Sequence, residues 1–240
     1  MSLSDAWEAH AAEWVAWARA PGHDSFWSVT LPALLEALPH SATATLDVGC
    51  GEGRLSRALA ERGHRVVGVD QSPTLVRAAG EMPDAPPVVR ADASRLPLRD
   101  DSFGLAVACM SLHDIDELDL AVQEVARVLQ RGGRFVAALV HPMASAGRFV
   151  ERTADAPFVI AGSYLQSSRF ATRVERGGLT MTFSSHHRPL RSYFAALEHA
   201  SLLTESVREV ATPDEVVAAD PADARWTRVP EVLVIRALKP

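Results

Sequence analysis

The chain has 240 residues, of which 48% are hydrophobic and 22% are charged, and its formal net charge is −6. This composition is typical of a globular protein with one large domain, or a domain and a small cap. The acidic balance, without a block of like charges, argues against a nucleic-acid surface and a polybasic membrane surface. Because the chain lacks a long apolar run and a basic, then apolar start, we expect no membrane span, no signal peptide and a cytoplasmic location.

Two predicted helices open the chain. Apolar side chains recur at helical spacing over residues 4–20, where Ser4 is a candidate N-cap. A second helix is expected over 26–38, with Pro32 inside it. Most of the tryptophans in this part are expected to pack in the core. We interpret residues 1–40 as a helical lid on a single domain that comprises residues 1–240.

Five short apolar runs then alternate with helical segments. Ser72 and Pro73 form an N-cap followed by proline at the first helical position, and Gly132-Gly133 is expected to stop the third helix. The alternation predicts βαβ units, and therefore a parallel sheet with helices on both faces. The expected strands are 45–48, 65–69, 88–91, 103–110 and 135–140, and the expected helices are 54–62, 73–80 and 118–129.

The pattern changes after His141. Residues 143–170 have no strong periodicity, and two extended segments around Arg176-Gly177-Gly178 predict a β-hairpin. A helix is expected from Pro189 to about Leu203. Further strands are expected over 206–210 and 232–237. We interpret residues 143–188 as an insertion that caps the edge of the sheet.

Polar or small residues follow the predicted strands. In open parallel sheets, ligands bind at the carboxyl ends of the strands, beside the point where the strand order reverses. The sequence therefore predicts a ligand site at this edge. At the carboxyl ends of the five strands, in chain order, the residues are Asp47 and Gly49, Asp70, Asp92, Met110 and Ser111, and His141.

The glycine loop from Leu46 to Gly53 restricts the ligand. Its spacing is G-x-G-x-G, with Arg54 where the dinucleotide fingerprint G-x-G-x-x-G has its third glycine. Asp47 would repel a pyrophosphate, whereas it suits a positively charged ligand. Asp70 can accept hydrogen bonds from a ribose diol, and Asp92 from the amine of an adenine. These residues together predict a nucleoside with a cationic, zwitterionic tail.

In these motifs the chain resembles the class I S-adenosylmethionine-dependent methyltransferases of the small-molecule type, related to the ubiquinone and menaquinone biosynthesis enzymes. The resemblance covers about residues 43–141 and is carried by LDVGCGEG, VVGVDQS, RADASRLPL, and SLHDI followed by EVARVLQRGGRFV. It departs from the family at Phe103-Gly104, where relatives have Phe-Asp. It implies a Rossmann-like, seven-stranded, mainly parallel sheet, and S-adenosylmethionine as the methyl donor, which leaves S-adenosylhomocysteine.

The resemblance also implies roles for individual residues. Backbone groups of the glycine loop would hold the methionine part, with Asp47 near its ammonium. Asp70 would bind the ribose, Gln71 would lie along the adenine, and Asp92 would bind the adenine amine. Each acid alone fits a helix or turn cap, but their recurrence at successive strand ends favours a site. The implied cofactor-binding residues are Asp47, Gly49, Gly51, Asp70, Gln71, Asp92, Ala93 and Met110, with Ser111 flanking the methionine.

The sequence leaves the catalytic base open. His113, His141 and His186 are the candidates for a general base or pocket wall, with His187 and Tyr164 as further ones. For His113 a structural role beside the cofactor is an equal alternative. A metal held by His141 and His186 lacks a carboxylate partner at ligand spacing, so we predict no metal site. Cys50 and Cys109 are expected to be buried thiols.

The predicted function is methyl transfer to a small organic acceptor by in-line displacement, with the acceptor atom (O, N or C) undetermined. An alternative is a module that binds S-adenosylmethionine without transferring the methyl group. The glycine spacing disfavours a nicotinamide dehydrogenase, and the missing N/D-P-P-Y/F tetrapeptide disfavours adenine methylation of nucleic acid. We expect neither nucleic-acid nor membrane partners, and a monomer or homodimer.

Overall fold

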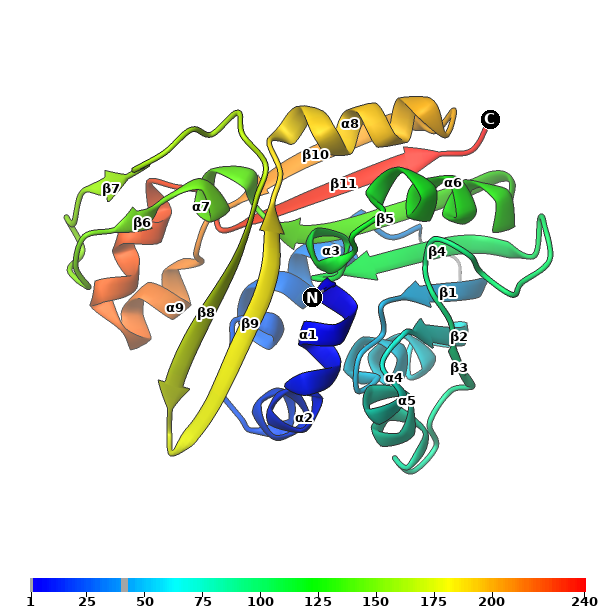
Figure 1. Ribbon diagram of the computed structural model, residues 1–240, viewed down its shortest axis with the longest axis horizontal. Coiled ribbons are helices and arrows are strands. Elements are labelled where there is room, and N and C mark those ends of the chain that lie inside the picture. Colours follow the sequence, from blue (N-terminus) through cyan, green and yellow to red (C-terminus); the bar gives the residue numbers. More distant parts are fainter. Residues whose placement is uncertain (1, 40–42) are drawn as a thin grey trace.

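The computed structural model of the protein describes residues 2–39 and 43–240. A seven-stranded sheet with the order β10-β11-β5-β4-β1-β2-β3 forms its centre (Figure 1). Strands β1 to β5 pair in parallel, and β11 runs antiparallel between β5 and β10. The strands are β1 Ala44–Val48, β2 Arg65–Asp70, β3 Val88–Arg90, β4 Phe103–Cys109, β5 Leu129–Val140, β10 Leu203–Val210 and β11 Val232–Leu238.

Helices cover both faces of the sheet. Helices α6 (Leu118–Val128) and α8 (Leu190–His199) pack on one face, and α3 (Leu31–Ala37) and α4 (Arg54–Ala60) pack on the other. Strand β4 contributes Ala106 to the first core and Leu105 to the second, because successive side chains of a strand point to opposite faces. Burial on both faces explains why the parallel strands are continuous apolar runs in the sequence.

The N-terminal segment differs in detail from the prediction. The expected helix 4–20 is two helices, α1 (Leu3–Ala9) and α2 (Ala11–Arg19), because the backbone leaves the helical region at His10. Ser2 rather than Ser4 caps α1, and its Oγ accepts a hydrogen bond from Asp5 N at 3.0 Å. The expected helix 26–38 is a π-helical turn, η1 (Phe26–Thr30), followed by α3. Residues 1 and 40 of the predicted lid lie outside the described residues.

Two helix ends also correct the prediction. Gly132-Gly133 does not stop α6, which ends at Val128, and the glycine pair lies inside β5, where Gly132 N donates to Lys239 O at 2.8 Å. Helix α8 ends at His199 rather than near Leu203, because Ser201 adopts a left-handed conformation (φ 57°). Helix α5 (Pro73–Gly80) begins as predicted, with Leu75 N donating to Ser72 Oγ.

The segment between β5 and α8 lies across one side of the sheet edge (Figure 1). Its main element is the predicted hairpin, which is longer than expected: β8 (Ser168–Arg176) and β9 (Leu179–His187) are joined by Gly177-Gly178, both with positive φ. The same segment also contains α7 (Pro142–Ala146), β6 (Arg148–Phe149) and β7 (Phe158–Val159). The remaining short helices are η2 (Leu112–Asp114) after β4, and α9 (Asp214–Ala219) and η3 (Pro221–Thr227) between β10 and β11.

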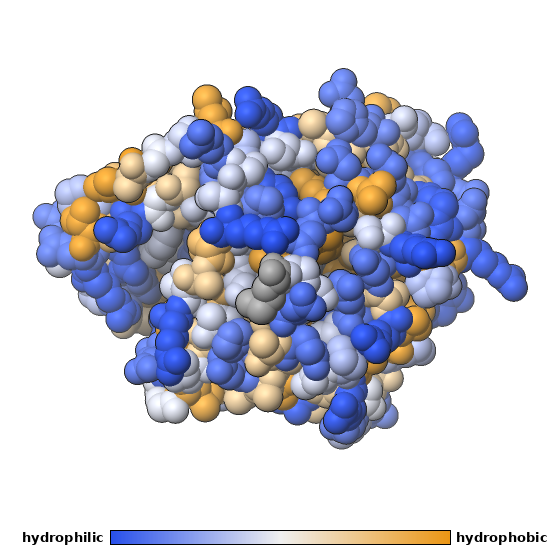
Figure 2. All heavy atoms as spheres, viewed as in Figure 1, coloured by the Kyte–Doolittle hydropathy of each residue, from blue (hydrophilic) through white to orange (hydrophobic). Residues whose placement is uncertain are grey.

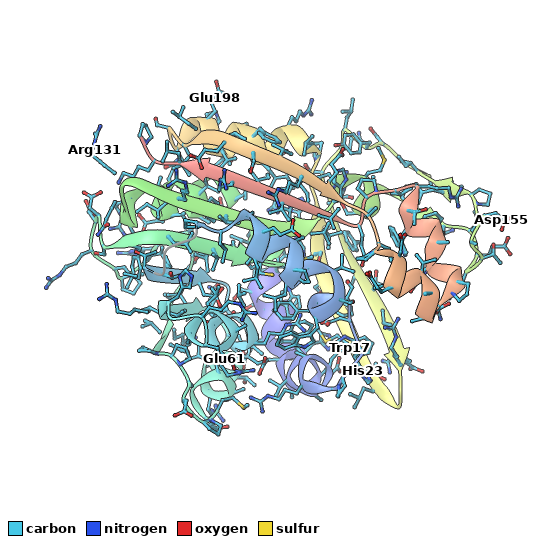
Figure 3. All side chains as sticks on the ribbon, turned by 180° about the vertical axis from the view of Figure 1, so that it is seen from behind. Trp17, His23, Glu61, Arg131, Asp155 and Glu198 are labelled. Carbon is cyan, nitrogen blue, oxygen red and sulfur yellow. The ribbon has the colours of Figure 1, made fainter. Side chains whose placement is uncertain are left out.

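Hydrophilic residues cover most of the face seen in Figure 2, with hydrophobic residues in small groups among them. Seen from behind, Trp17 of α2 lies beside His23, and their ring centroids are 5.1 Å apart (Figure 3). In the part of the chain that the structure describes, every helix is too short or too polar to cross a membrane.

Candidate functional site

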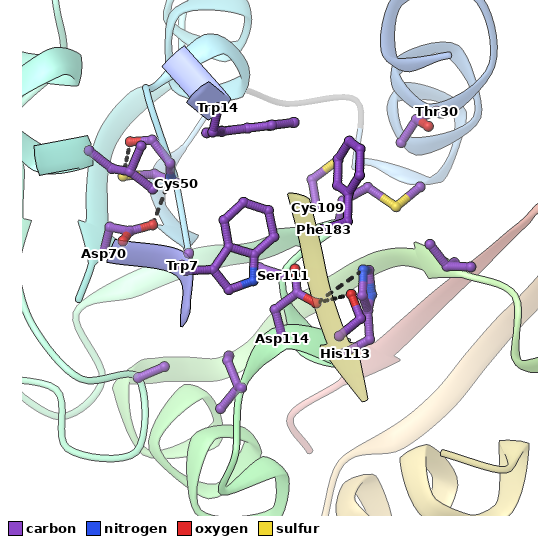
Figure 4. Close-up of a pocket in the computed structure, with 18 of the residues that line it drawn as sticks. Trp7, Trp14, Thr30, Cys50, Asp70, Cys109, Ser111, His113, Asp114 and Phe183 are labelled. Carbon is purple, nitrogen blue, oxygen red and sulfur yellow. Dashed lines mark hydrogen bonds and ion pairs between the residues drawn. The ribbon is translucent and has the colours of Figure 1, made fainter. Parts of the chain in front are cut away.

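A cavity of about 990 Å³ lies at the carboxyl ends of the parallel strands. Its volume is at the upper end of the range of roughly 300–1,000 Å³ that is typical of small-molecule sites. The ends of the strands, the N-terminal helices and the β8–β9 hairpin surround it (Figure 4). The structure brings all eight predicted cofactor residues to its wall, namely Asp47, Gly49, Gly51, Asp70, Gln71, Asp92, Ala93 and Met110.

The glycine loop turns tightly between β1 and α4. Gly49 and Gly51 have positive φ angles of 69° and 58°, a conformation that glycine adopts without strain. A Cβ atom on Gly49 would lie 2.5 Å from Cβ of Ser111, so no larger residue fits there. The loop uses its own N–H groups: Gly49 N and Cys50 N donate to Val69 O, and Gly51 N donates to Asp70 Oδ2 at 2.9 Å. Its N–H groups are therefore largely engaged within the protein.

Two carboxyl groups flank this loop, that of the buried Asp47 and that of the half-buried Asp70. Asp47 is 1% exposed and accepts a hydrogen bond from Ser56 Oγ at 2.6 Å, and burial raises its pKa to about 7. Asp70 accepts from Gly51 N and from Ser72 N, both at 2.9 Å. Burial raises the pKa of Asp70 too, against the opposing effect of these backbone hydrogen bonds. Both acids gain from a ligand that brings positive charge or hydrogen-bond donors.

The remaining predicted cofactor residues form the rim and floor of the cavity. Asp92 is exposed, and Oδ1 accepts from both the N–H and the Oγ of Ser94 at 2.8 Å. Met110 follows β4 with a φ of 53°, which is uncommon outside glycine and marks a backbone held by its surroundings. Its N–H donates to Ala138 O at 2.7 Å.

His113 is the candidate base that lines the cavity. The residue is 7% exposed, Nε2 lies 3.7 Å from Asp114 Oδ1, and Nδ1 has no hydrogen-bond partner among the described residues. Burial, with a smaller contribution from Arg188, lowers the pKa of His113 to about 4. Asp114 accepts from Ser185 Oγ of the hairpin at 2.6 Å, and burial raises its pKa well above the usual value. The imidazole is therefore neutral near pH 7.

The structure does not bring His141 or His186 to the cavity wall. His141 does follow the fifth strand, but its Nδ1 accepts from Met143 N at 3.0 Å and so caps α7, while Nε2 lies 2.9 Å from Glu209. His187 is held between Ser145 Oγ and Tyr164 O. His141 and His187 therefore have structural partners and lie outside the cavity wall. His186 is partly buried, which together with nearby cationic groups lowers its pKa to about 4.

Arg188 fixes the turn that carries His113. This side chain is 5% exposed, and its guanidinium donates to four backbone carbonyls, those of residues 112, 113, 115 and 116, at 2.5–3.4 Å. Neither Arg188 nor Asp114 was identified from the sequence. Asp114 adjoins His113 in the SLHDI motif, which is a local signal. Arg188 has no such signal, because its partners lie more than 70 residues earlier in the chain.

The N-terminal helices and the hairpin contact each other above the cavity. Trp7 Nε1 donates to Ser184 O at 2.9 Å, and Glu13 accepts from Thr182 N at 3.2 Å. The rings of Trp7 and Trp14 meet edge to face, and Trp14 meets Phe183 in the same way (Figure 4). The residues predicted as lid and cap thus form a continuous aromatic wall.

Comparisons with known proteins agree with this architecture. Residues 46–137 match the model of a methyltransferase domain. The demethylmenaquinone methyltransferase of Clavibacter sepedonicus is 35% identical over 120 residues, which cover 48% of this chain and 47% of that protein. An S-adenosylmethionine-dependent methyltransferase structure from Mesorhizobium loti is 28% identical, with a TM-score of 0.73 over 90% of this chain and 98% of that one.

The structure of the [4+2]-cyclase SpnF has a TM-score of 0.64 at 18% identity, over 99% of this chain and 95% of that chain, and therefore shares the fold. The chain spans between 29% and 50% of the length of the first curated relatives that it matches.

The sheet order and the neighbours define a Rossmann-like methyltransferase fold, as predicted. The comparisons support a class I S-adenosylmethionine-dependent methyltransferase domain over residues 46–137, a family whose cofactor is S-adenosylmethionine. Within residues 2–39 and 43–240, no three His, Cys, Asp or Glu side chains are grouped so that they could hold a metal ion.

Proposed function

We propose that the protein transfers a methyl group from S-adenosylmethionine to a small organic acceptor. The observation that carries this proposal is that one cavity contains both the predicted donor-binding acids and the buried His113–Asp114 pair. A cavity of about 990 Å³ has room for the donor and a small acceptor together. The bound cofactor would supply an electrophilic methyl group, and the protein would supply position and proton handling.

The residues at the strand ends suit this cofactor. Each carboxylate oxygen of Asp70 has a further lone pair beyond its backbone hydrogen bond, so the side chain can also accept two hydrogen bonds from a ribose diol. Asp92 at the rim would take the adenine amine, beside Gln71 and Ala93. The carbonyl oxygens of Gly49 and Gly51 would accept from the ammonium, near Asp47.

His113 is proposed as the general base for an acceptor that loses a proton. Its depressed pKa keeps the imidazole neutral near pH 7, so that it can accept a hydrogen bond from the acceptor, and makes it a weaker base than a histidine with the usual pKa. Asp114 lies 3.7 Å from Nε2 and is oriented by Ser185; because burial raises its pKa, it would stabilise the imidazolium only when it is itself ionised. Holding the acceptor in line with the methyl group contributes by orientation, which is worth roughly 7–11 kcal/mol at best.

The acceptor side of the cavity favours a largely apolar molecule. The hairpin contributes Phe170 and Phe183 to its wall, strands β5 and β11 contribute Val140 and Val232, and η3 contributes Trp226. Polar side chains, among them Ser145, Thr172 and Glu231, also line the cavity and could fix the orientation of a polar group on the ligand. We therefore propose an apolar or aromatic acceptor with one reactive polar group.

A binding module without methyl transfer is the second candidate. One observation favours it: a protein with the same fold is named a [4+2]-cyclase, and a fold does not by itself determine a reaction. The test is an assay with methyl-labelled S-adenosylmethionine and a panel of phenols, amines and carboxylic acids. Acceptor-dependent S-adenosylhomocysteine supports the enzyme. Tight cofactor binding without turnover supports the module, and NAD(H) binding without S-adenosylmethionine binding would contradict both.

A further inference from the structure

Arg54 is a cation inside the cavity for which the reaction above has no role. Among the described residues that line the cavity, the cationic ones are Arg54 and Arg148. Arg148 is exposed, whereas the Arg54 side chain is only 10% exposed. A guanidinium that is nine-tenths buried and still borders a cavity is expensive unless its N–H groups are satisfied. Arg54 is therefore the more informative of the two.

The guanidinium of Arg54 is held in one orientation. Its Cζ lies 3.9 Å from the ring centroid of Phe26 and 4.9 Å from that of Trp14, so aromatic faces contact it. Its Nη1 donates to Asp24 Oδ2 at 2.6 Å, and Asp24 Oδ1 in turn accepts from Phe26 N at 3.1 Å. The side chain is thus oriented before any ligand arrives.

Most of its donors remain available. Arginine has five N–H groups in a planar fork, and within the described part of the protein only Nη1 of Arg54 donates a hydrogen bond. Trp14 Nε1 is likewise unpaired there, and it lies 3.2 Å from the position of a Cβ on Gly51. Two sets of unused donors therefore meet beside the glycine loop.

Most N–H groups of the glycine loop are already engaged within the protein. Those of Gly49, Cys50, Gly51 and Gly53 donate to protein acceptors. The carbonyl oxygens of the loop suit an ammonium, whereas few of its donors remain for a carboxylate. Arg54 follows the loop directly. The N–H groups of its guanidinium that do not donate to Asp24 can serve as donors to a carboxylate.

We propose that Arg54, oriented by Asp24 and flanked by Trp14 and Phe26, is a binding site for a ligand carboxylate inside the cavity. Two ligands can supply that group: the amino-acid tail of the donor, or an acceptor that is itself a carboxylic acid. The first source rests on the proposed function, whereas the second needs only that the cavity binds small molecules.

The test uses Arg54→Met and Arg54→Lys, with Arg148→Met as the matched control, and circular dichroism to verify folding. Titration calorimetry compares S-adenosylhomocysteine with 5′-methylthioadenosine, which is the same nucleoside without the amino-acid tail. Ligand-observed NMR compares benzoate, phenylacetate and hexanoate with their amides. Arg54→Lys keeps the charge but not the bidentate geometry, so it separates loss of the site from loss of folding.

If the donor supplies the carboxylate, Arg54→Met weakens S-adenosylhomocysteine about 10- to 100-fold, the expected loss of a charge-assisted hydrogen bond. Arg54→Lys has an intermediate effect, and the affinity for 5′-methylthioadenosine is unchanged. If the acceptor supplies it, S-adenosylhomocysteine binding is unchanged and the acids, but not the amides, lose binding. Arg148→Met behaves like wild type in both cases.

Three outcomes overturn the inference: no carboxylate loses affinity in Arg54→Met, the two nucleosides lose affinity equally, or Arg148→Met has the same effect. Wild-type protein that fails to bind S-adenosylhomocysteine contradicts the proposed function instead. The NMR arm still tests Arg54 in that case.

Discussion

The two halves of the cavity are constructed in different ways. The donor half consists of residues at or just after the carboxyl ends of β1, β2, β3 and β4, and each of these strands is paired on the sheet. The acceptor half is formed by helices α1 and α2, the β8–β9 hairpin and the turn that carries His113, which come from distant parts of the chain. The donor half is therefore fixed by local turns on a rigid sheet, whereas the acceptor half depends on contacts between separate segments.

The difference has an energetic counterpart. In the donor half, the acids Asp47 and Asp70 lie in an environment that raises their pKa. In the acceptor half, the wall is held by aromatic contacts and by hydrogen bonds such as that from Trp7 Nε1 to Ser184 O. Substitutions should accordingly separate cofactor binding from turnover. The following predictions test this separation.

The largest effect is expected for His113→Gln. Removing a general base lowers kcat by about 10²–10⁴-fold, while the Kd for S-adenosylhomocysteine stays within about twofold because no predicted donor contact changes. In the wild type, the acid limb of kcat/KM should lie near the depressed pKa of about 4, well below the usual value of 6.5. Steady-state kinetics at several pH values measure kcat and kcat/KM, and calorimetry measures the Kd for S-adenosylhomocysteine. A parallel loss of cofactor affinity would contradict the separation of the two halves.

Asp47→Asn tests the cost of the buried acid. In the unfolded chain this carboxyl group ionises with a pKa near 3.8, whereas in the folded protein its pKa is about 7. Because the folded state holds the proton more tightly, wild-type stability falls as pH rises through this window. The stability of the variant should not fall in this way. Between pH 4 and pH 8, its free energy of unfolding should therefore rise relative to that of the wild type by at most roughly 4 kcal/mol. Denaturant unfolding of both proteins at several pH values measures this difference in stability. If the free energy of unfolding changes with pH in the same way in both proteins, the prediction is refuted.

Asp70→Ala should weaken S-adenosylhomocysteine by roughly 1–3 kcal/mol, because it removes the acceptor of the ribose hydroxyls. It also leaves Gly51 N and Ser72 N without their partner, so a circular dichroism control is needed. Asp92→Ala is the matched comparison at the exposed rim, where water competes and a smaller loss is expected. Equal losses at the two positions would show that burial does not set the strength of these contacts.

The smallest effect on turnover is expected for His141→Ala. The substitution removes the hydrogen bond that caps α7 and should cost roughly 1 kcal/mol of stability. Activity should stay within about threefold, since the imidazole lies outside the cavity wall. Thermal unfolding and an activity assay are sufficient. A loss of activity as large as that of His113→Gln would place His141 in the reaction.

The same contrast explains what could be predicted from the sequence. The glycine loop, Asp70 and Asp92 follow apolar runs with turn residues, so their position at one edge of a parallel sheet follows from local patterns. His141 was also placed at the end of its strand. Its surroundings could not be predicted, because they depend on β10, whose Glu209 comes from the antiparallel edge of the sheet.

The acceptor half could not be predicted from local sequence patterns, for a physical reason. The hydrogen bond between Glu13 and Thr182 joins residues 169 positions apart, and no periodicity in either segment indicates the partner. The exposed side of the hairpin also lacks the strict alternation of a half-buried strand. By contrast, Asp114 could have been recognised as the neighbour of His113, because two ionisable groups at the end of one apolar strand share the same buried turn.

The hydrogen bonds from Arg188 to the turn after β4 have a consequence for protein redesign. Since this residue ends the hairpin and donates to carbonyls of residues 112–116, the hairpin and the turn after β4 form one exchangeable unit. Grafting a relative's hairpin alone would leave those carbonyls buried without a donor, at a cost of roughly 1–3 kcal/mol each. A chimera that changes acceptor choice should therefore transplant both pieces together and keep the glycine loop of the host.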